Sequence, residues 1–177
     1  MSAVNPGLLT DSDLLRPSWS TTAAVGASET LTPAGDPTIE PRTREITIAV
    51  SKTLQSQPWF RPTLGQLAEY LRLGDDWDGY GARPIHDSAV KRAVAVLDAV
   101  CPAGPEPWIV PTPEGGLQIE WASDGLEIEI EILASGPAQV LIVEPSGEES
   151  EFPVFSDSTD TWDLLRDRIA EMRCRTT

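Results

Sequence analysis

Apolar and polar residues alternate along the second half of the chain with the period of two that is typical of half-buried β-strands. The alternating stretches are "WIVP", "GLQIEW", "LEIEIEI" and "QVLIVE", which begin at residues 108, 116, 126 and 139. They are separated by "TPEGG", "ASDG" and "ASGPA", compositions that are typical of turns. "EESEFPVF", from residue 148, can add a short edge strand. The pattern predicts an antiparallel meander of four or five strands.

Three other stretches space their apolar residues by three and four positions, as an amphipathic helix does. The first predicted helix begins with Thr63 as its N-cap and ends at Gly74. The second is capped by one of residues 86–88 and ends before Pro102. The third covers "STDTWDLLRDRIAEMRCR" near the C-terminus. The apolar faces are Leu64, Leu67, Ala68 and Leu71, then Val90, Ala93, Val94, Leu97 and Val100, then Trp162, Leu165, Ile169 and Met172.

Together these elements predict an α+β fold, in which helices pack on one face of the antiparallel meander sheet. Residues 1–42 are rich in Ser, Thr, Pro, Gly and Ala and lack a sustained apolar period, so we expect a disordered N-terminal arm. Residues 43–177 then form a single domain. Within it, alternation at Ile46, Ile48 and Val50 favours one more short strand.

The turn between the two central strands predicts which residues face each other. If Asp124 and Gly125 form a two-residue type I′ turn, Glu120 lies opposite Glu129. Successive side chains of a strand point to opposite faces, so one face of the sheet is apolar and packs against the helices. Its members on the central strand are Leu126, Ile128, Ile130 and Ile132. The other face gathers Glu120, Glu127, Glu129 and Glu131.

Charge is distributed very unevenly along the chain. The net charge is −15, and residues 106–160 contain thirteen Asp and Glu residues and no Lys or Arg. Such a region projects a negative field that repels nucleic acid and attracts basic surfaces. We therefore expect a basic protein as partner and no direct binding of nucleic acid.

The four outward glutamates allow three interpretations. Directly opposed like charges destabilise a sheet, so their gathering calls for an explanation. They can form a solvated surface that tolerates roughly a few tenths of a kcal/mol per pair. They can be the docking face for a basic protein, which would supply arginines. They can also bind a divalent cation, which takes oxygen ligands. A flat sheet face surrounds an ion poorly, so the first two interpretations are favoured, and we expect no metal or cofactor.

The segment "DDWDGYGA", residues 75–82, places carboxylates, aromatic rings and glycines between two predicted helices. Aligned as an EF-hand loop, it lacks oxygen ligands at two essential positions, so a calcium site is not supported. A structural loop is favoured, in which the aromatic rings act as anchors, Asp-Gly forms a turn and the last glycine permits a positive φ. The loop residues in this interpretation are Trp77, Asp78, Gly79, Tyr80 and Gly81.

Three segments together resemble a group of small, uncharacterised bacterial proteins. They are "WDGYGARPI", "PTPEGGLQIEW" and "LEIEIEI", all within residues 75–132. In that group Trp-Asp-Gly-Tyr-Gly-Ala, a helix, Pro-Thr-Pro-x-Gly-Gly-x-Gln-x-Glu-Trp and Leu-Glu-Ile-Glu-Ile recur in this order. The resemblance implies a small bacterial domain in which Asp78, Gly79, Glu120 and Trp121 occupy recurrent positions. It implies no activity.

The residues give little support to an enzyme. The chain has one histidine, His86, at a predicted helix cap, and "TPEGGLQ" lacks the lysine and hydroxyl residue of a phosphate-binding loop. We therefore predict a non-catalytic interaction module of the antitoxin, immunity-protein, chaperone or inhibitor type. The alternative is a carboxylate-dependent, metal-binding hydrolase that uses Glu120 and Glu129.

The expected location is the cytoplasm. No apolar run approaches the length of a membrane span, and the N-terminal residues lack the basic start and apolar centre of a signal peptide. The two cysteines, Cys101 and Cys174, are not accompanied by histidines at ligand spacing, so two reduced thiols are favoured over a disulfide.

Overall fold

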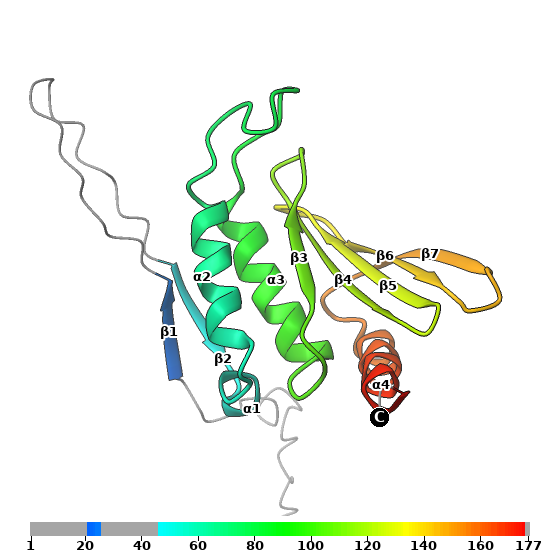
Figure 1. Cartoon of the computed structure of the whole chain (residues 1–177). Coiled ribbons are helices and arrows are strands. Elements are labelled where there is room, and N and C mark those ends of the chain that lie inside the picture. Colours follow the sequence, from blue (N-terminus) through cyan, green and yellow to red (C-terminus); the bar gives the residue numbers. More distant parts are fainter. Residues whose placement is uncertain (1–20, 26–45, 176–177) are drawn as a thin grey trace, which may run out of the picture.

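The computed structural model describes residues 21–25 and 46–175 of the chain, with the side chains of residues 46–172 (Figure 1). No helix in these ranges is both long and apolar enough to cross a membrane. In chain order the elements are β1 (Thr21–Val25), β2 (Ile46–Val50), α1 (Lys52–Gln55), α2 (Phe60–Tyr70), α3 (Asp87–Val100), β3 (Trp108–Pro111), β4 (Leu117–Ser123), β5 (Leu126–Ile132), β6 (Ala138–Val143), β7 (Glu149–Val154) and α4 (Thr159–Arg175).

The last five strands form one antiparallel sheet in the order β3-β4-β5-β6-β7, so each strand pairs with the one that follows it in the chain. The α+β meander predicted from the alternation is therefore confirmed, and the short fifth strand is β7. Helices α3 and α4 both contact β4 and lie on the same side of the sheet (Figure 1). The sheet thus has an inner face against the helices and an outer face that no helix of the described residues covers.

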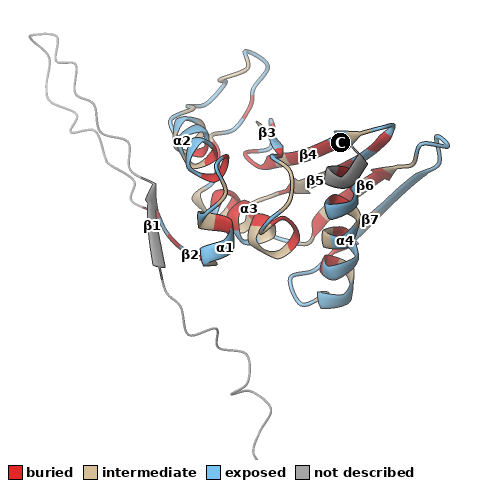
Figure 2. Ribbon diagram, turned by 60° about the horizontal axis from the view of Figure 1, so that its bottom comes forward, coloured by how far each residue is buried: buried red, intermediate tan, exposed pale blue. Residues whose placement is uncertain are grey.

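The core lies between the inner face and helices α3 and α4, where the buried residues gather (Figure 2). Every second residue of the central strands is buried there, and the fully buried side chains include Ile119, Ile128 and Ile130 from the sheet and Leu97 and Leu165 from the helices. The predicted apolar faces of α3 and α4 are confirmed. Burial of apolar surface stabilises a protein by roughly 25 cal/mol per Å². The inner face of the sheet, packed against these helices, is therefore the main source of stability.

The register of β4 and β5 is the one expected from the turn. Asp124 has φ 51° and Gly125 has φ 81°, and a type I′ turn requires positive values at both positions. Glu120 therefore faces Glu129, and the residues beside them, Ile119 and Ile130, face each other on the inner side.

A second, two-stranded sheet pairs β1 with β2, with Ala23 opposite Ile48. The strand expected from Ile46, Ile48 and Val50 is confirmed, and these three side chains are buried. β1 falls inside residues 1–42, for which the sequence predicted a disordered arm; its five residues, TTAAV, form a strand instead. The rest of the predicted arm lies outside the described residues.

The boundaries of α2 differ from the prediction. The helix begins at Phe60 rather than after Thr63, and Thr63 lies inside it, where its hydroxyl donates to the carbonyl of Trp59 at 2.9 Å. Pro62 occupies the first turn, where a backbone N–H has no partner within the helix, so the proline is tolerated there. The helix ends at Tyr70, ahead of the predicted end at Gly74, in tight turns.

Candidate functional site

The outer face of the sheet is built from three rows of side chains that run across the strands. The central row is Trp108, Glu120, Glu129, Leu141 and Glu151. On one side of it lie Val110, Gln118, Glu131, Gln139 and Pro153, and on the other Ala122, Glu127, Val143 and Glu149. All of these residues are half-buried or exposed. The structure thus brings together all four predicted glutamates, and we call Glu120, Glu127, Glu129 and Glu131 the acidic face.

Gln118 connects two members of the acidic face. Its side-chain Nε2 donates to Glu129 Oε2 at 2.9 Å and to Glu120 Oε1 at 3.1 Å. One amide group thereby holds two carboxylates that lie opposite each other. The sequence could not predict this contact, because strand alternation determines the side of the sheet on which Gln118 lies but not its rotamer.

Glu129 is the electrostatic centre of the acidic face. Partial burial raises the pKa of its carboxyl group above the ordinary value of 4.5, and the neighbouring charges of Glu120 and Glu127 raise it further. The hydrogen bond from Gln118 to Glu129 favours the charged form of this carboxyl group but does not outweigh these effects. A carboxylate with a raised pKa and carboxylate neighbours is a group that a positive charge would stabilise.

No ion pair among residues 46–172 supplies such a charge to the acidic face. Within residues 46–172, the ion pairs join Arg72 to Glu69, Arg166 to Asp163 and Arg168 to Glu144, and none includes a glutamate of the acidic face. Residues 106–160 contain no Lys or Arg at all. Among the side chains that the structure describes, none forms an ion pair that compensates the negative charge of the acidic face.

The hydrolase alternative requires a cluster of side chains that can hold a metal ion, and the described residues form none. Among the described residues, no group of three or more His, Cys, Asp or Glu side chains is placed to hold a metal ion. The side chain of His86, at the N-cap position of α3, is exposed and makes no capping hydrogen bond. Cys101 is buried, and its Sγ lies 3.1 Å from the carbonyl oxygen of Pro105, to which it donates.

The loop at residues 75–82 is held by its own aspartates. Asp78 Oδ1 accepts from the backbone N–H groups of Tyr80 and Ala82, and Asp76 Oδ1 accepts from that of Gly81. Gly79 has φ 76° and Gly81 φ 94°, as expected for the turn. The expectation of a structural loop therefore agrees with the use of both carboxylates as acceptors for backbone N–H groups.

Tyr80 departs from its predicted role. Its side chain is 94% exposed, so it anchors nothing within the described residues. Trp77 is half-buried, and its indole N–H donates to the carbonyl of Arg83 at 3.0 Å. Of the two aromatic rings, Trp77 therefore has a hydrogen bond that holds the loop, whereas Tyr80 lies in solvent.

Two of the segments that carry the resemblance, "WDGYGARPI" and "PTPEGGLQIEW", are joined by backbone hydrogen bonds near the end of the first segment. The N–H of Arg83 donates to the carbonyl of Pro113 at 2.8 Å, and the N–H of His86 donates to that of Gly115 at 3.0 Å. A Cβ on Gly115 would lie 2.7 Å from the carbonyl oxygen of Pro84, so only glycine fits there. The close approach of the Pro84 backbone thus explains why Gly115 of "PTPEGG" is a glycine.

Comparisons of the chain with protein-family models, with curated proteins and with solved structures gave no match.

Proposed function

We propose that this protein is a non-catalytic interaction module that engages a basic protein partner through the acidic face. The observation that carries the proposal is the cluster around Glu129, in which three carboxylates approach one another on an outward surface, within a stretch, residues 106–160, that contains no Lys or Arg. Cross-strand pairs of opposite charge would stabilise the sheet, whereas this arrangement opposes like charges. Arginines from a partner would convert that repulsion into attraction.

The rest of the outer face supports docking rather than catalysis. Leu141 and Val143 are half-exposed between the glutamates of β5 and those of β7, so apolar and acidic side chains alternate across the surface. Interfaces combine apolar contact with charges that select the partner. An antitoxin, an immunity protein, a chaperone or an inhibitor of a nucleic-acid-binding protein would each use such a surface. We propose the cytoplasm as the location of the protein.

The test is capture of partners by the full chain and by two variants of equal charge. One variant carries Glu127→Gln, Glu129→Gln and Glu131→Gln; the control carries Glu114→Gln, Glu148→Gln and Glu171→Gln, three exposed acids away from the acidic face. We expect basic proteins to be captured by the wild type and by the control, and to be lost from the first variant. Equal capture by both variants would refute the proposal.

A further inference from the structure

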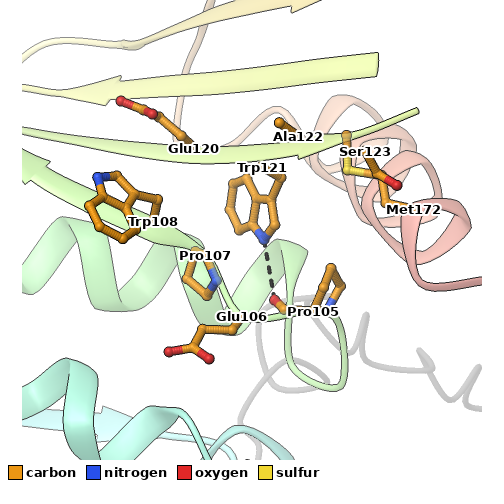
Figure 3. A pocket seen from close by; sticks show the side chains of 9 residues that line it. All are labelled: Pro105, Glu106, Pro107, Trp108, Glu120, Trp121, Ala122, Ser123 and Met172. Atoms are coloured by element: carbon orange, nitrogen blue, oxygen red, sulfur yellow. Dashed lines mark hydrogen bonds between the residues drawn. The ribbon is translucent and has the colours of Figure 1, made fainter. Parts of the chain in front are cut away.

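An open pocket of about 680 Å³ lies beside β4, where β3 begins (Figure 3). β3 pairs with Leu117–Glu120, so among the described residues the last three of β4 have no neighbouring strand on this side. The segment 105–107 passes here, and its prolines at both ends lack the N–H groups that would continue the ladder. Met172 of α4 completes the wall.

Two indole rings line this pocket. Trp108 is 66% exposed, one of the largest apolar surfaces that the described residues present to solvent. Trp121 is buried, and its N–H donates to the carbonyl of Pro105 at 3.3 Å, which fixes the ring in place (Figure 3). The ring of Pro107 lies between the two indoles in this view.

Carboxylates complete the lining. Glu120 lies opposite Trp108 in the pairing of β3 with β4, and its Oε1 accepts from Gln118, so this carboxylate is oriented. Glu106 also lines the pocket, and among the residues whose side chains are described no Lys or Arg does. Aromatic faces and carboxylates at one site are the combination that attracts organic cations, through cation–π interaction and charge pairing.

We propose that this pocket binds the guanidinium group of an arginine side chain of the basic partner, stacked on Trp108 and paired with Glu120; this inference rests on the proposed function. Arginine fits better than lysine because its planar guanidinium can stack on an indole and pair with a carboxylate at the same time. The central row of the outer face begins at Trp108 and continues to Glu120 and Glu129, so the pocket is continuous with the acidic face.

The probe is a short peptide that alternates arginine and glycine, titrated into the full chain and followed through the indole N–H signals in NMR. Matched peptides carry lysine or the neutral isostere citrulline in place of arginine. We expect the arginine peptide to shift the Trp108 signal, which a Trp108→Phe variant identifies. The lysine peptide should bind more weakly, and the citrulline peptide should not bind.

Two variants test the assignment. Trp108→Ala and Glu120→Gln should each weaken binding of the arginine peptide by about threefold, the scale of one exposed cation–π contact. Phe155→Ala removes an aromatic ring that is 55% exposed elsewhere and should leave binding unchanged. Because Trp108 is largely exposed, its truncation should preserve the fold, which a melting curve checks. Unchanged affinity in Trp108→Ala, or no shift of its signal, would overturn the inference.

The peptide experiment distinguishes a wrong assignment of the pocket from a wrong assignment of the acidic face. If the variant with Gln at 127, 129 and 131 loses the arginine peptide while Trp108→Ala retains it, the face binds and the pocket does not. If Trp108→Ala loses the peptide while the triple variant retains it, the pocket binds and the proposed function of the face is wrong.

Discussion

The two faces of the sheet are made by the same strands, yet they obey different constraints. On the inner face Ile119 and Ile130 lie opposite each other and are fully buried, so each contributes to stability. One position along, on the outer face, Glu120 lies opposite Glu129 and the pKa of Glu129 is raised. The inner face is what the fold requires. On the outer face, by contrast, neighbouring carboxylates repel one another, which lowers stability slightly.

The largest expected effect comes from the inner face. Ile130→Ala should lower the free energy of unfolding by about 3 kcal/mol, because it removes buried methyl groups and leaves a cavity. Leu141→Ala, on the outer face of β6 and half-exposed, should cost less than about 1 kcal/mol. Urea denaturation of both variants measures the difference, and equal losses would abolish the contrast between the faces.

A smaller loss of stability is expected at Gln118, whose amide group donates to two carboxylates of the acidic face. Gln118→Ala removes the donors to Glu120 and Glu129 and should cost about 1 kcal/mol at neutral pH. Gln139→Ala is the matched control, a half-exposed glutamine on the same face. The loss in Gln118→Ala should shrink at acidic pH, where Glu129 is protonated. If both glutamine variants unfold alike, Gln118 does not support the carboxylates.

Glu129→Gln should instead stabilise the protein at pH 7, by roughly 0.5 kcal/mol, because it removes a charge that its neighbours repel. The gain should be larger at low salt than at high salt, since ions screen the repulsion. Thermal melts at two ionic strengths test this. A variant that melts like the wild type at every salt concentration would favour the solvated-surface interpretation.

The same group predicts a pH dependence. The pKa of Glu129 is higher in the folded state than its ordinary 4.5, so between these two values the folded protein binds more protons than the unfolded chain. Its contribution to stability is therefore fully present below 4.5 and is lost as the pH rises through the folded pKa. The difference in stability between wild type and Glu129→Gln, measured from pH 4 to pH 7, should grow in favour of the variant. A difference independent of pH would contradict the assignment.

The smallest effect is expected at Glu127, which is exposed and lies opposite Ala122 and Val143 rather than another acid. Glu127→Gln should change the free energy of unfolding by only roughly a few tenths of a kcal/mol. Comparison with Glu129→Gln by the same melts shows whether position in the cluster, rather than charge alone, sets the effect. A larger gain at Glu127 would place the centre of repulsion elsewhere.

The parts of this molecule that the sequence predicts are those that a period or a turn determines. Alternation gave the strands and their faces, and Asp124-Gly125 gave the register that opposes Glu120 and Glu129. β1 was not predicted because its sequence, TTAAV, does not alternate apolar and polar residues. The strand depends on its pairing with β2. The predicted N-cap at Thr63 is wrong because the first turn of a helix tolerates a proline, so α2 begins at Phe60 and includes Pro62.

Side-chain contacts were the least predictable feature of the candidate site. The bridging of two glutamates by Gln118 and the exposure of Tyr80 both depend on side-chain rotamers, which a residue pattern does not determine. Trp108 could have been placed on the outer face by extending the register to the first strand of the meander. Its contribution to a pocket could not, because that depends on where β3 begins.

The central claim is that the acidic face docks a basic protein, and site-specific photo-crosslinking tests it most directly. A photoreactive amino acid replaces Gln139, which lies on the outer face opposite Glu131, or Leu164, which is exposed on α4. We expect a basic protein to cross-link from position 139 and not from 164, and the product to disappear at high salt and in the variant with Gln at 127, 129 and 131. The same product from both positions, or one that persists in that variant, would contradict the account.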